Sequence, residues 1–207
     1  MVEGSQFDTL ILGIGNVLWA DEGFGVRCVE AMNATYAFPD NVRVMDGGTQ
    51  GLYLLPYVEA ARRLVIFDAV DYGLEPGTLK LVENAEVPKF MGAKKMSLHQ
   101  TGFQEVLACA DLVDHLPEEM VLIGVQPEEL EDYGGSLRPR IKARIPEVLE
   151  IAVERLVGWG IPVVARGTGE TMRAESGILD IQRYEMERPT EEQACRLGDI
   201  RFLATGV

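Results

Sequence analysis

The stretch that decides the fold is residues 9–25, TLILGIGNVLWADEGFG. Its apolar run at residues 9–12 breaks at Gly13, turns through Gly-Ile-Gly-Asn and reaches two adjacent carboxyl groups, Asp21 and Glu22. A short continuous apolar run is typical of a strand that is buried on both faces in a parallel sheet. The stretch therefore predicts a buried strand, a tight glycine turn and a helix that begins near the acidic pair.

The alternation of apolar runs and helical patterns continues along the chain. Four further runs predict strands: residues 42–45, 64–67, 78–82 and 120–125. The first helix is predicted to bury Val26, Val29 and Met32 and to expose Arg27 and Glu30 on its other face. Alternating strands and helices indicate an α/β sandwich with a mostly parallel sheet. The run at residues 78–82 is more polar than the others, which predicts that this strand lies at an edge of the sheet.

Polar side chains follow the predicted strands, at the point where each strand ends. These residues are Glu22, Asp46, Asp68 and Gln126. In open α/β sheets, ligands bind beyond the carboxyl ends of the strands. The pattern therefore predicts the location of a site and leaves its chemistry open.

Composition limits the classes of partner. The chain has 207 residues, 47% of them hydrophobic, which is enough for one domain with a substantial core. Its formal net charge of -14 would repel nucleic acid and anionic membranes, whereas a cation or a partner with a basic surface fits. No uncharged run approaches the roughly 18 residues that span a bilayer, so membrane insertion is not expected.

The chain is expected to consist of a single α/β domain at residues 1–166 and a C-terminal extension at residues 167–207. The extension is rich in Glu and Arg, and its apolar residues show no sustained period, so it is expected to be partly irregular or disordered.

Three widely spaced cysteines form no Cys-x-x-Cys pair, and the N-terminus has no basic segment of the kind that begins a secretory signal. A reducing cytoplasm is the expected location.

Two common chemistries fit the sequence poorly. Gly13-Ile14-Gly15 opens like a dinucleotide-binding fingerprint, but Leu18 stands in place of the third glycine, and the acidic pair would repel a pyrophosphate. No Gly-x-Ser-x-Gly motif is present for a serine nucleophile, and His115 beside Asp114 is more typical of a solvated helix end than of a catalyst. A nucleotide-binding regulatory domain remains the weaker alternative.

A cation site made by Glu22, Asp68 and His99 is the third candidate. Two carboxylates and one imidazole suit a divalent cation of intermediate hardness and leave coordination positions for substrate or water. His99 would lie in the first turn of a helix that Ser97-Leu98-His99-Gln100 begins as a capping box, where the helix dipole keeps the imidazole neutral. Each residue also has a purely structural reading, as a dipole partner, a turn cap or a helix-start residue, and no short motif links the three.

At these residues the chain also resembles a known family, the maturation endopeptidases of NiFe hydrogenases (HupD/HybD/HyaD-like). The resemblance runs from the first predicted strand to about residue 160, in several ordered motifs. These are GIGN at 13–16, DEGFGVR at 21–27, DGGT at 46–49, DA at 68–69, PGT at 76–78, SLHQ at 97–100 and GVQP at 124–127. Several motifs in one order make the resemblance specific.

The resemblance implies a three-layer α/β/α sandwich of the phosphorylase/hydrolase type with a twisted sheet. It implies that Glu22, Asp68 and His99 contact the metal, and that Asp46, Gly47, Gly48 and Thr49 recognise the substrate, with Glu22, Asp46, Asp68 and His99 as the catalytic set. The implied reaction removes the C-terminal extension of the large-subunit precursor after nickel insertion. On chemical grounds the metal is expected to polarise the scissile carbonyl or activate water, with Asp46 or Glu22 relaying a proton. The nickel is implied to arrive with the substrate, and no organic cofactor is implied. A zinc-dependent hydrolase with its own metal is the alternative.

Overall fold

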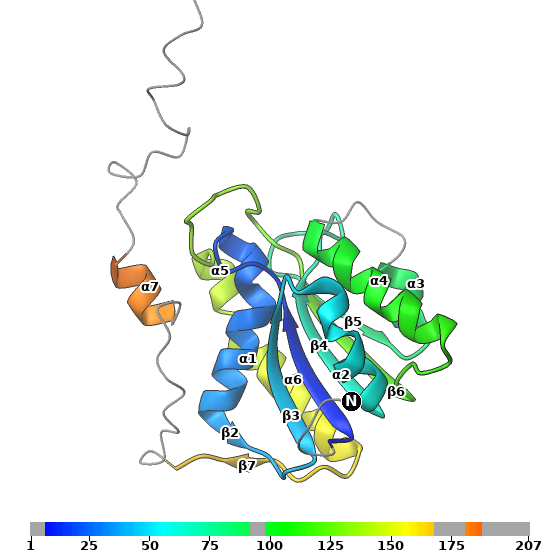
Figure 1. Cartoon of the computed structure of the whole chain (residues 1–207). Coiled ribbons are helices and arrows are strands. Elements are labelled where there is room, and N and C mark those ends of the chain that lie inside the picture. Colours follow the sequence, from blue (N-terminus) through cyan, green and yellow to red (C-terminus); the bar gives the residue numbers. More distant parts are fainter. Residues whose placement is uncertain (1–6, 92–97, 168–180, 188–207) are drawn as a thin grey trace, which may run out of the picture.

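A five-stranded sheet forms the centre of the molecule. The structure, a computed structural model, describes residues 7–91, 98–167 and 181–187 (Figure 1). The strand order is β3-β1-β4-β6-β5. The strands are β1 (Thr9–Ile14), β3 (Val42–Gly48), β4 (Arg63–Ala69), β5 (Leu79–Glu83) and β6 (Glu119–Val125). The first four in this order run parallel, and β5 pairs antiparallel with β6 at one edge, which confirms the mostly parallel sheet and the edge position of β5.

Helices cover both faces of the sheet (Figure 1). One core joins alternate residues of the central strands, such as Ile11, Val65 and Phe67, to α1 (Phe24–Thr35) and α6 (Ile145–Gly158). The other core joins the intervening residues, such as Leu12 and Ile66, to α2 (Leu55–Ala60) and α4 (Leu98–Leu112). Because side chains alternate along a strand, both faces are apolar and every central strand is buried. The predicted three-layer α/β/α sandwich is confirmed.

The remaining elements are short. They are the 3-10 helices η1 (Ala20–Gly23) and η2 (Gly51–Leu54), the helices α3 (Glu86–Met91) and α5 (Pro139–Lys142), and the strands β2 (Tyr36–Ala37) and β7 (Val164–Ala165). Strands β2 and β7 pair antiparallel, which ties the end of α1 to the chain that follows α6. The predicted cap Ser97 lies outside the described residues.

The first helix differs from the sequence prediction at one position. Val26, Val29 and Met32 are buried as expected, but Arg27 is also buried, with only 4% of its surface exposed. Its guanidinium donates to both carboxylate oxygens of Glu30, at 3.0 and 2.9 Å. The prediction that Arg27 is solvated was wrong because a segment distant in the sequence covers this face of the helix.

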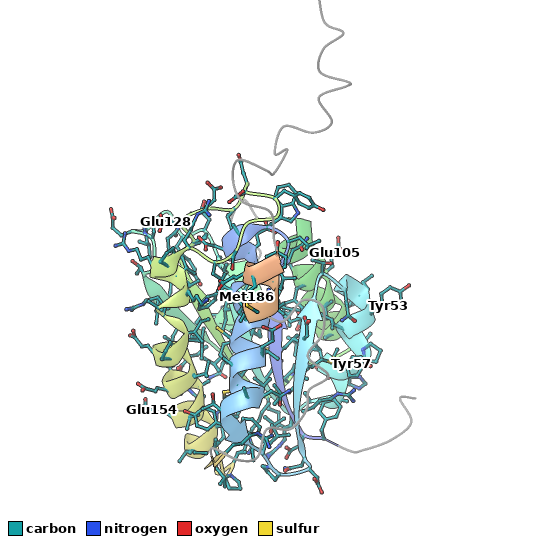
Figure 2. All side chains as sticks on the ribbon, turned by 90° about the vertical axis from the view of Figure 1, so that its left-hand side faces the viewer. Tyr53, Tyr57, Glu105, Glu128, Glu154 and Met186 are labelled. Atoms are coloured by element: carbon teal, nitrogen blue, oxygen red, sulfur yellow. The ribbon has the colours of Figure 1, made fainter. Side chains whose placement is uncertain are left out.

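That segment is α7 (Ile181–Glu187), which belongs to the C-terminal extension and lies across α1 (Figure 2). Glu185 accepts from Lys142 Nζ at 2.8 Å and from Ser136 Oγ at 2.8 Å, and Tyr184 lies 5.7 Å from the Arg27 guanidinium carbon. Part of the extension is therefore helical and docked, while the division of the chain at residue 166 stays a prediction. None of the helices among the described residues is long and apolar enough to cross a membrane.

Candidate active site

The turn after β1 brings the acidic pair to the carboxyl edge of the sheet. Gly15 has φ +136°, and a Cβ there would collide with the Glu22 carbonyl oxygen. A Cβ on Gly25 would likewise collide with the carbonyl oxygens of Ile14 and Phe67. Only glycine permits such close approaches of two backbones. Gly15 and Gly25 therefore allow η1 and the start of α1 to pack closely against β1 and β4.

Asp21 is fully buried and anchors this turn. Its Oδ2 accepts from the backbone N–H groups of Glu128 and Glu129, both at 2.9 Å, and its Oδ1 accepts from Arg138 N at 2.7 Å. Burial raises the pKa of Asp21, and the three backbone hydrogen bonds counter part of that rise. Asp21 thus fixes η1 to the loop between β6 and α5, a role that sequence reasoning missed because the partners lie more than a hundred residues away.

Glu22 is next in sequence and has different surroundings. It lies in η1 and is half-buried, with its carboxyl group partly removed from water. This burial raises the pKa of Glu22 from its ordinary 4.5 to about 7. A carboxyl group with a pKa near neutrality can hold or release a proton under physiological conditions, which is a requirement for general acid–base chemistry.

Asp68 lies near the end of β4 and is fully buried. Phe67 belongs to the core beside α1, so the next side chain, that of Asp68, projects to the opposite face, which α4 covers. The 3-10 helix that carries Glu22 packs directly against β4. The turn that carries Glu22 therefore lies beside the strand that carries Asp68.

Asp46 lies on the other face. It pairs with Gly13 on β1. A Cβ added to Gly13 would lie 2.8 Å from Val29 Cγ2 on α1, so this position of the sheet faces α1. Paired residues of neighbouring strands project to the same side, so the Asp46 side chain lies toward α1 and Asp68 lies toward α4. The pairing of β1 with β3 shifts by one residue directly after this pair: Ile14 pairs with Gly48, so Gly47 is an extra, bulged residue of β3. Asp46 and Asp68 therefore project to opposite faces of the sheet.

The electrostatic setting of Asp46 agrees with that placement. Although the residue as a whole is exposed, the neighbouring chain crowds its carboxyl group and raises its pKa. The backbone N–H of Gly48 and the Arg27 guanidinium lower the pKa, but by less. The glycine turns after β1 and β3 are joined by a hydrogen bond from Gly15 N to Gly48 O at 3.1 Å. The DGGT segment is therefore held beside the acidic turn, with Thr49 exposed.

The first turn of α4 lies at the same edge of the sheet. Helix α4 leads into β6, which is parallel to β4, so α4 runs away from the carboxyl edge. Gly102, in its second turn, approaches Gly51, and a Cβ there would lie 3.4 Å from the Gly51 Cα. His99 falls in the first turn, but its side chain lies outside the described part of the structure. The side chains that are described contain no cluster of three His, Cys, Asp or Glu residues able to hold a metal, so the predicted set with His99 remains untested.

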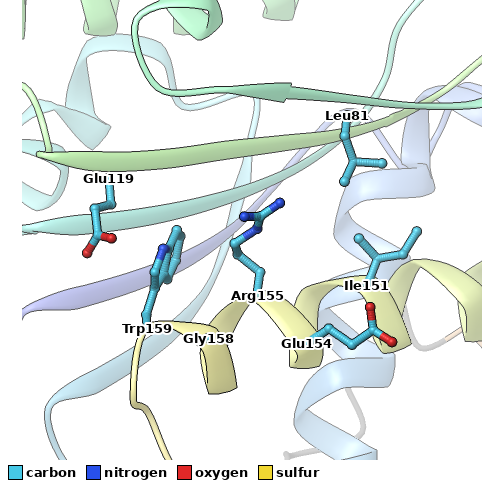
Figure 3. Close-up of a pocket in the computed structure, with 7 residues that line it drawn as sticks. All are labelled: Leu81, Glu119, Ile151, Glu154, Arg155, Gly158 and Trp159. Carbon is cyan, nitrogen blue, oxygen red and sulfur yellow. The ribbon is translucent and has the colours of Figure 1, made fainter.

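A cavity of about 560 Å³ lies elsewhere, between α6 and the sheet edge formed by β5 and β6 (Figure 3). Glu119 and Trp159 are among its lining residues, and Arg155 there forms an ion pair with Glu83. Glu119 begins β6, so the cavity reaches toward the end of the sheet opposite Asp68. No predicted site residue lines it.

Comparison with known proteins identifies the family. A family model described as hydrogenase maturation protease matches residues 26–155. The hydrogenase expression/formation protein HoxM of Azotobacter vinelandii is 60% identical over 194 residues, 94% of this chain and 93% of that protein. HupD of Rhodobacter capsulatus, with the same description, is 58% identical over 193 residues, 93% of this chain and 91% of that protein.

The chain belongs to the hydrogenase maturation protease family.

A solved structure supports the assignment at the level of the fold. The hydrogenase maturating endopeptidase HybD from E. coli is 37% identical, with a TM-score of 0.73, and the match covers 77% of this chain and 98% of HybD. The alignment with HoxM takes in 94% of the chain. Part of this maturation protease beyond its HybD-like domain therefore has a counterpart in HoxM.

Proposed function

We propose that this protease removes the C-terminal extension from the large-subunit precursor of a NiFe hydrogenase after nickel has been inserted. The observation that carries the proposal is that the turn bearing Glu22 lies against β4, the strand that carries the buried Asp68. His99, in the first turn of α4, is the third ligand in this proposal. The nickel belongs to the substrate.

The burial of both carboxyl groups explains selectivity for a loaded precursor. An ionised carboxylate that is withdrawn from water is unfavourable until an opposite charge reaches it. A bound Ni²⁺ supplies that charge, and oxygen and imidazole groups are ligands it accepts. A precursor without nickel leaves the two carboxylates uncompensated. The difference in affinity between the two forms is then the step that prevents premature cleavage.

The proposed division of labour follows from the two faces of the sheet. A metal ion near a scissile peptide polarises its carbonyl and lowers the pKa of bound water. Glu22, whose pKa is about 7 before nickel arrives, in this proposal uses the carboxylate oxygen that nickel leaves free to accept the proton of the attacking water, and it returns that proton to the amine that leaves when the C–N bond breaks. Asp46 lies across the sheet from Asp68, so in this proposal it acts with Gly47, Gly48 and Thr49 in binding the precursor chain rather than in the proton transfer.

We also place the reaction in the cytoplasm. Two cysteines in the described part of the chain, Cys28 and Cys109, are free thiols, as a reducing compartment would keep them. The strongly acidic chain favours partners that carry a cation or a basic surface, and a nickel-loaded precursor carries a cation.

The test compares nickel-loaded and nickel-free precursor, each incubated with the full-length protease and followed by the mobility shift on a gel. Cleavage of the loaded form only is expected, and Asp68→Asn is expected to abolish it. Equal cleavage of both forms would contradict nickel recognition. Elemental analysis of the purified protease accompanies the assay, since stoichiometric zinc in the active protein would instead favour a hydrolase with its own metal.

A further inference from the structure

Two aromatic side chains from distant segments meet beside the turn that carries Glu22. The ring centroids of Trp19 and Tyr133 are 5.1 Å apart and the ring planes are inclined at 62°, an edge-to-face arrangement. Trp19 directly precedes η1, and its carbonyl oxygen accepts from Glu22 N at 2.9 Å. Tyr133 lies in the loop between β6 and α5, which Figure 1 shows beside the start of α1. Both residues follow the carboxyl ends of their strands, so the pair lies at the edge of the sheet that carries the candidate site.

Backbone contacts hold the two rings in this arrangement. Trp19 and Tyr133 form an antiparallel β-bridge, and Gly134 N donates to Leu18 O at 2.7 Å. Ala20 has φ +41°, a conformation that is unfavourable for a residue with a Cβ and persists only where surrounding contacts enforce it. These contacts add to the three hydrogen bonds that join the acidic turn to the same loop. The geometry of the pair is therefore fixed before a partner arrives.

The pair is nevertheless open to solvent. Tyr133 has 60% of its surface exposed, and Trp19 is half-buried. Among the side chains that the structure describes, Tyr53 on η2 is the only other exposed aromatic one, and it also follows a strand end at this edge. Tyrosine and tryptophan are enriched among the residues that dominate binding at protein interfaces. Packing of one ring on the other accounts for the buried side of the pair, and the exposed side remains for a partner.

The loop that carries Tyr133 presents negative charge at its surface. Glu128 and Glu131 are exposed, whereas Asp132 is buried and forms an ion pair with Arg138 at 3.0 Å. The face of an aromatic ring attracts a cation, and acidic groups nearby add to that attraction. An apolar side chain would gain only from the rings, whereas a basic side chain gains from the rings and from the charge. The surface therefore fits lysine or arginine.

We propose that Trp19 and Tyr133 receive a lysine or arginine side chain of the folded precursor beside the cleavage site. The inference rests on the proposed function, which supplies the partner and places its cation at Glu22. Because the backbones of Trp19 and Glu22 are hydrogen-bonded, a precursor surface that brings its cation to this turn also lies against the aromatic pair. The rings are already in place, so docking orders no loop and the contact contributes to affinity. The pair takes no part in the chemical step, and its loss affects precursor binding rather than turnover.

Kinetics with full-length protease and nickel-loaded precursor test the contact. Tyr133→Phe keeps the ring, Tyr133→Leu keeps apolar area without a π face, and Tyr133→Ala removes both. The control is Leu112→Ala, which removes an exposed apolar side chain at the far end of α4. Tyr133→Leu and Tyr133→Ala are expected to raise KM about fivefold with kcat unchanged, which is the pattern of lost binding. Tyr133→Phe is expected to retain the affinity because it keeps the ring, and the control is expected to match the wild type.

The outcomes of this series are distinct. Wild-type KM values in both Tyr133→Leu and Tyr133→Ala would overturn the inference and leave the proposed function intact. A higher KM in Tyr133→Ala alone would show that an apolar surface meets the rings, which would overturn the basic side chain. Equal cleavage of nickel-loaded and nickel-free precursor by the wild type would overturn the nickel recognition of the proposed function, and the KM ratios among the variants would still report on the contact.

A charge reversal keeps the inference testable if thermal unfolding shows that the Tyr133 variants are not folded. Glu128→Lys leaves both rings in place and is expected to raise KM about threefold, because it repels a basic side chain at the pair. Glu154→Lys on α6, toward the other end of the molecule (Figure 2), is the matched control, since it makes the same change in net charge. Equal KM values for the two variants would overturn the role of a basic side chain at this surface.

Discussion

At the scale of single residues, two adjacent carboxyl groups have opposite surroundings. The Asp21 carboxylate receives three backbone N–H groups and joins two distant segments, whereas the Glu22 carboxyl is half-withdrawn from water and has its pKa raised to about 7. The first is a structural residue, and the second is suited to proton transfer.

Neutralising these two residues with isosteric amides is expected to have different consequences. Asp21→Asn keeps one acceptor oxygen and places an NH₂ group against a backbone donor, so the free energy of unfolding should fall by about 2–4 kcal/mol. Urea unfolding measures this, with Glu22→Gln, the same change one residue later, as the matched control. Equal stability of the two variants would show that the Asp21 hydrogen bonds do not hold the turn.

The stability of Glu22→Gln is expected to depend on pH differently from that of the wild type. The folded state binds the Glu22 proton up to about pH 7, whereas the unfolded chain releases it near 4.5. Stability of the wild type therefore falls as pH rises through this window, because the ionised form is disfavoured in the fold. Glu22→Gln lacks this loss, so its stability relative to the wild type should increase from pH 4.5 to pH 7 and then level off. A difference that is independent of pH would contradict the raised pKa.

At the scale of elements, the site depends on how closely α1 approaches β1 and β4. Gly25, in the first turn of α1, has the carbonyl oxygens of Ile14 and Phe67 where a Cβ would be. Both obstacles are backbone atoms of buried strands, so neither can move aside as a side chain can. The spacing of this helix from the sheet is therefore fixed by glycine, and it sets the position of η1 and of Glu22.

Gly25→Ala is accordingly expected to lower the free energy of unfolding by about 3 kcal/mol or more, since added volume cannot be accommodated there. Gly158→Ala at the end of α6 is the matched control, because nothing lies within 4 Å of a Cβ there, and it should be neutral or slightly stabilising. Denaturant unfolding of both variants gives the comparison. A Gly25→Ala protein as stable as the Gly158→Ala protein would contradict the close packing.

At the scale of the whole molecule, charge determines which partners can approach. The net charge of -14 makes encounter with a basic or metal-bearing surface favourable and repels other acidic chains. The docked helix α7 carries a further acidic group, Glu185, whose carboxylate forms an ion pair with Lys142 on α5. The precursor therefore meets an acidic molecule whose candidate site lies at one edge of the sheet.

Binding of the nickel-loaded precursor is expected to weaken when the salt concentration is raised from about 0.05 M to about 0.5 M, because salt screens charges outside the buried site. Surface-based binding measurements can follow this, with a neutral osmolyte as the control for nonspecific solvent effects. The change should appear mainly in the association rate. An association rate that does not respond to salt would show that the overall charge has no part in docking.

The amino-acid sequence by itself determined the alternation of elements, the buried character of β1 and β4, the glycine turn after β1 and the acidic or polar ends of the strands. These features depend on residues close in sequence, through side-chain periodicity and backbone freedom, so they can be read locally. The ordered motifs also predicted the family, which the comparisons confirmed. The site roles of Glu22, Asp46, Asp68 and His99, and of the DGGT segment, stay predictions.

Only the tertiary structure decided the rest. Strand order and register place Asp46 and Asp68 on opposite faces of the sheet. The partners of Asp21 are 107 to 117 residues away, and Tyr72 is held by Gln126, 54 residues away. Arg27 is buried because α7 covers it. Periodicity reports which face of an element is apolar, but it does not report which distant segment packs there, and hydrogen bonds across that distance form only when the sheet is assembled.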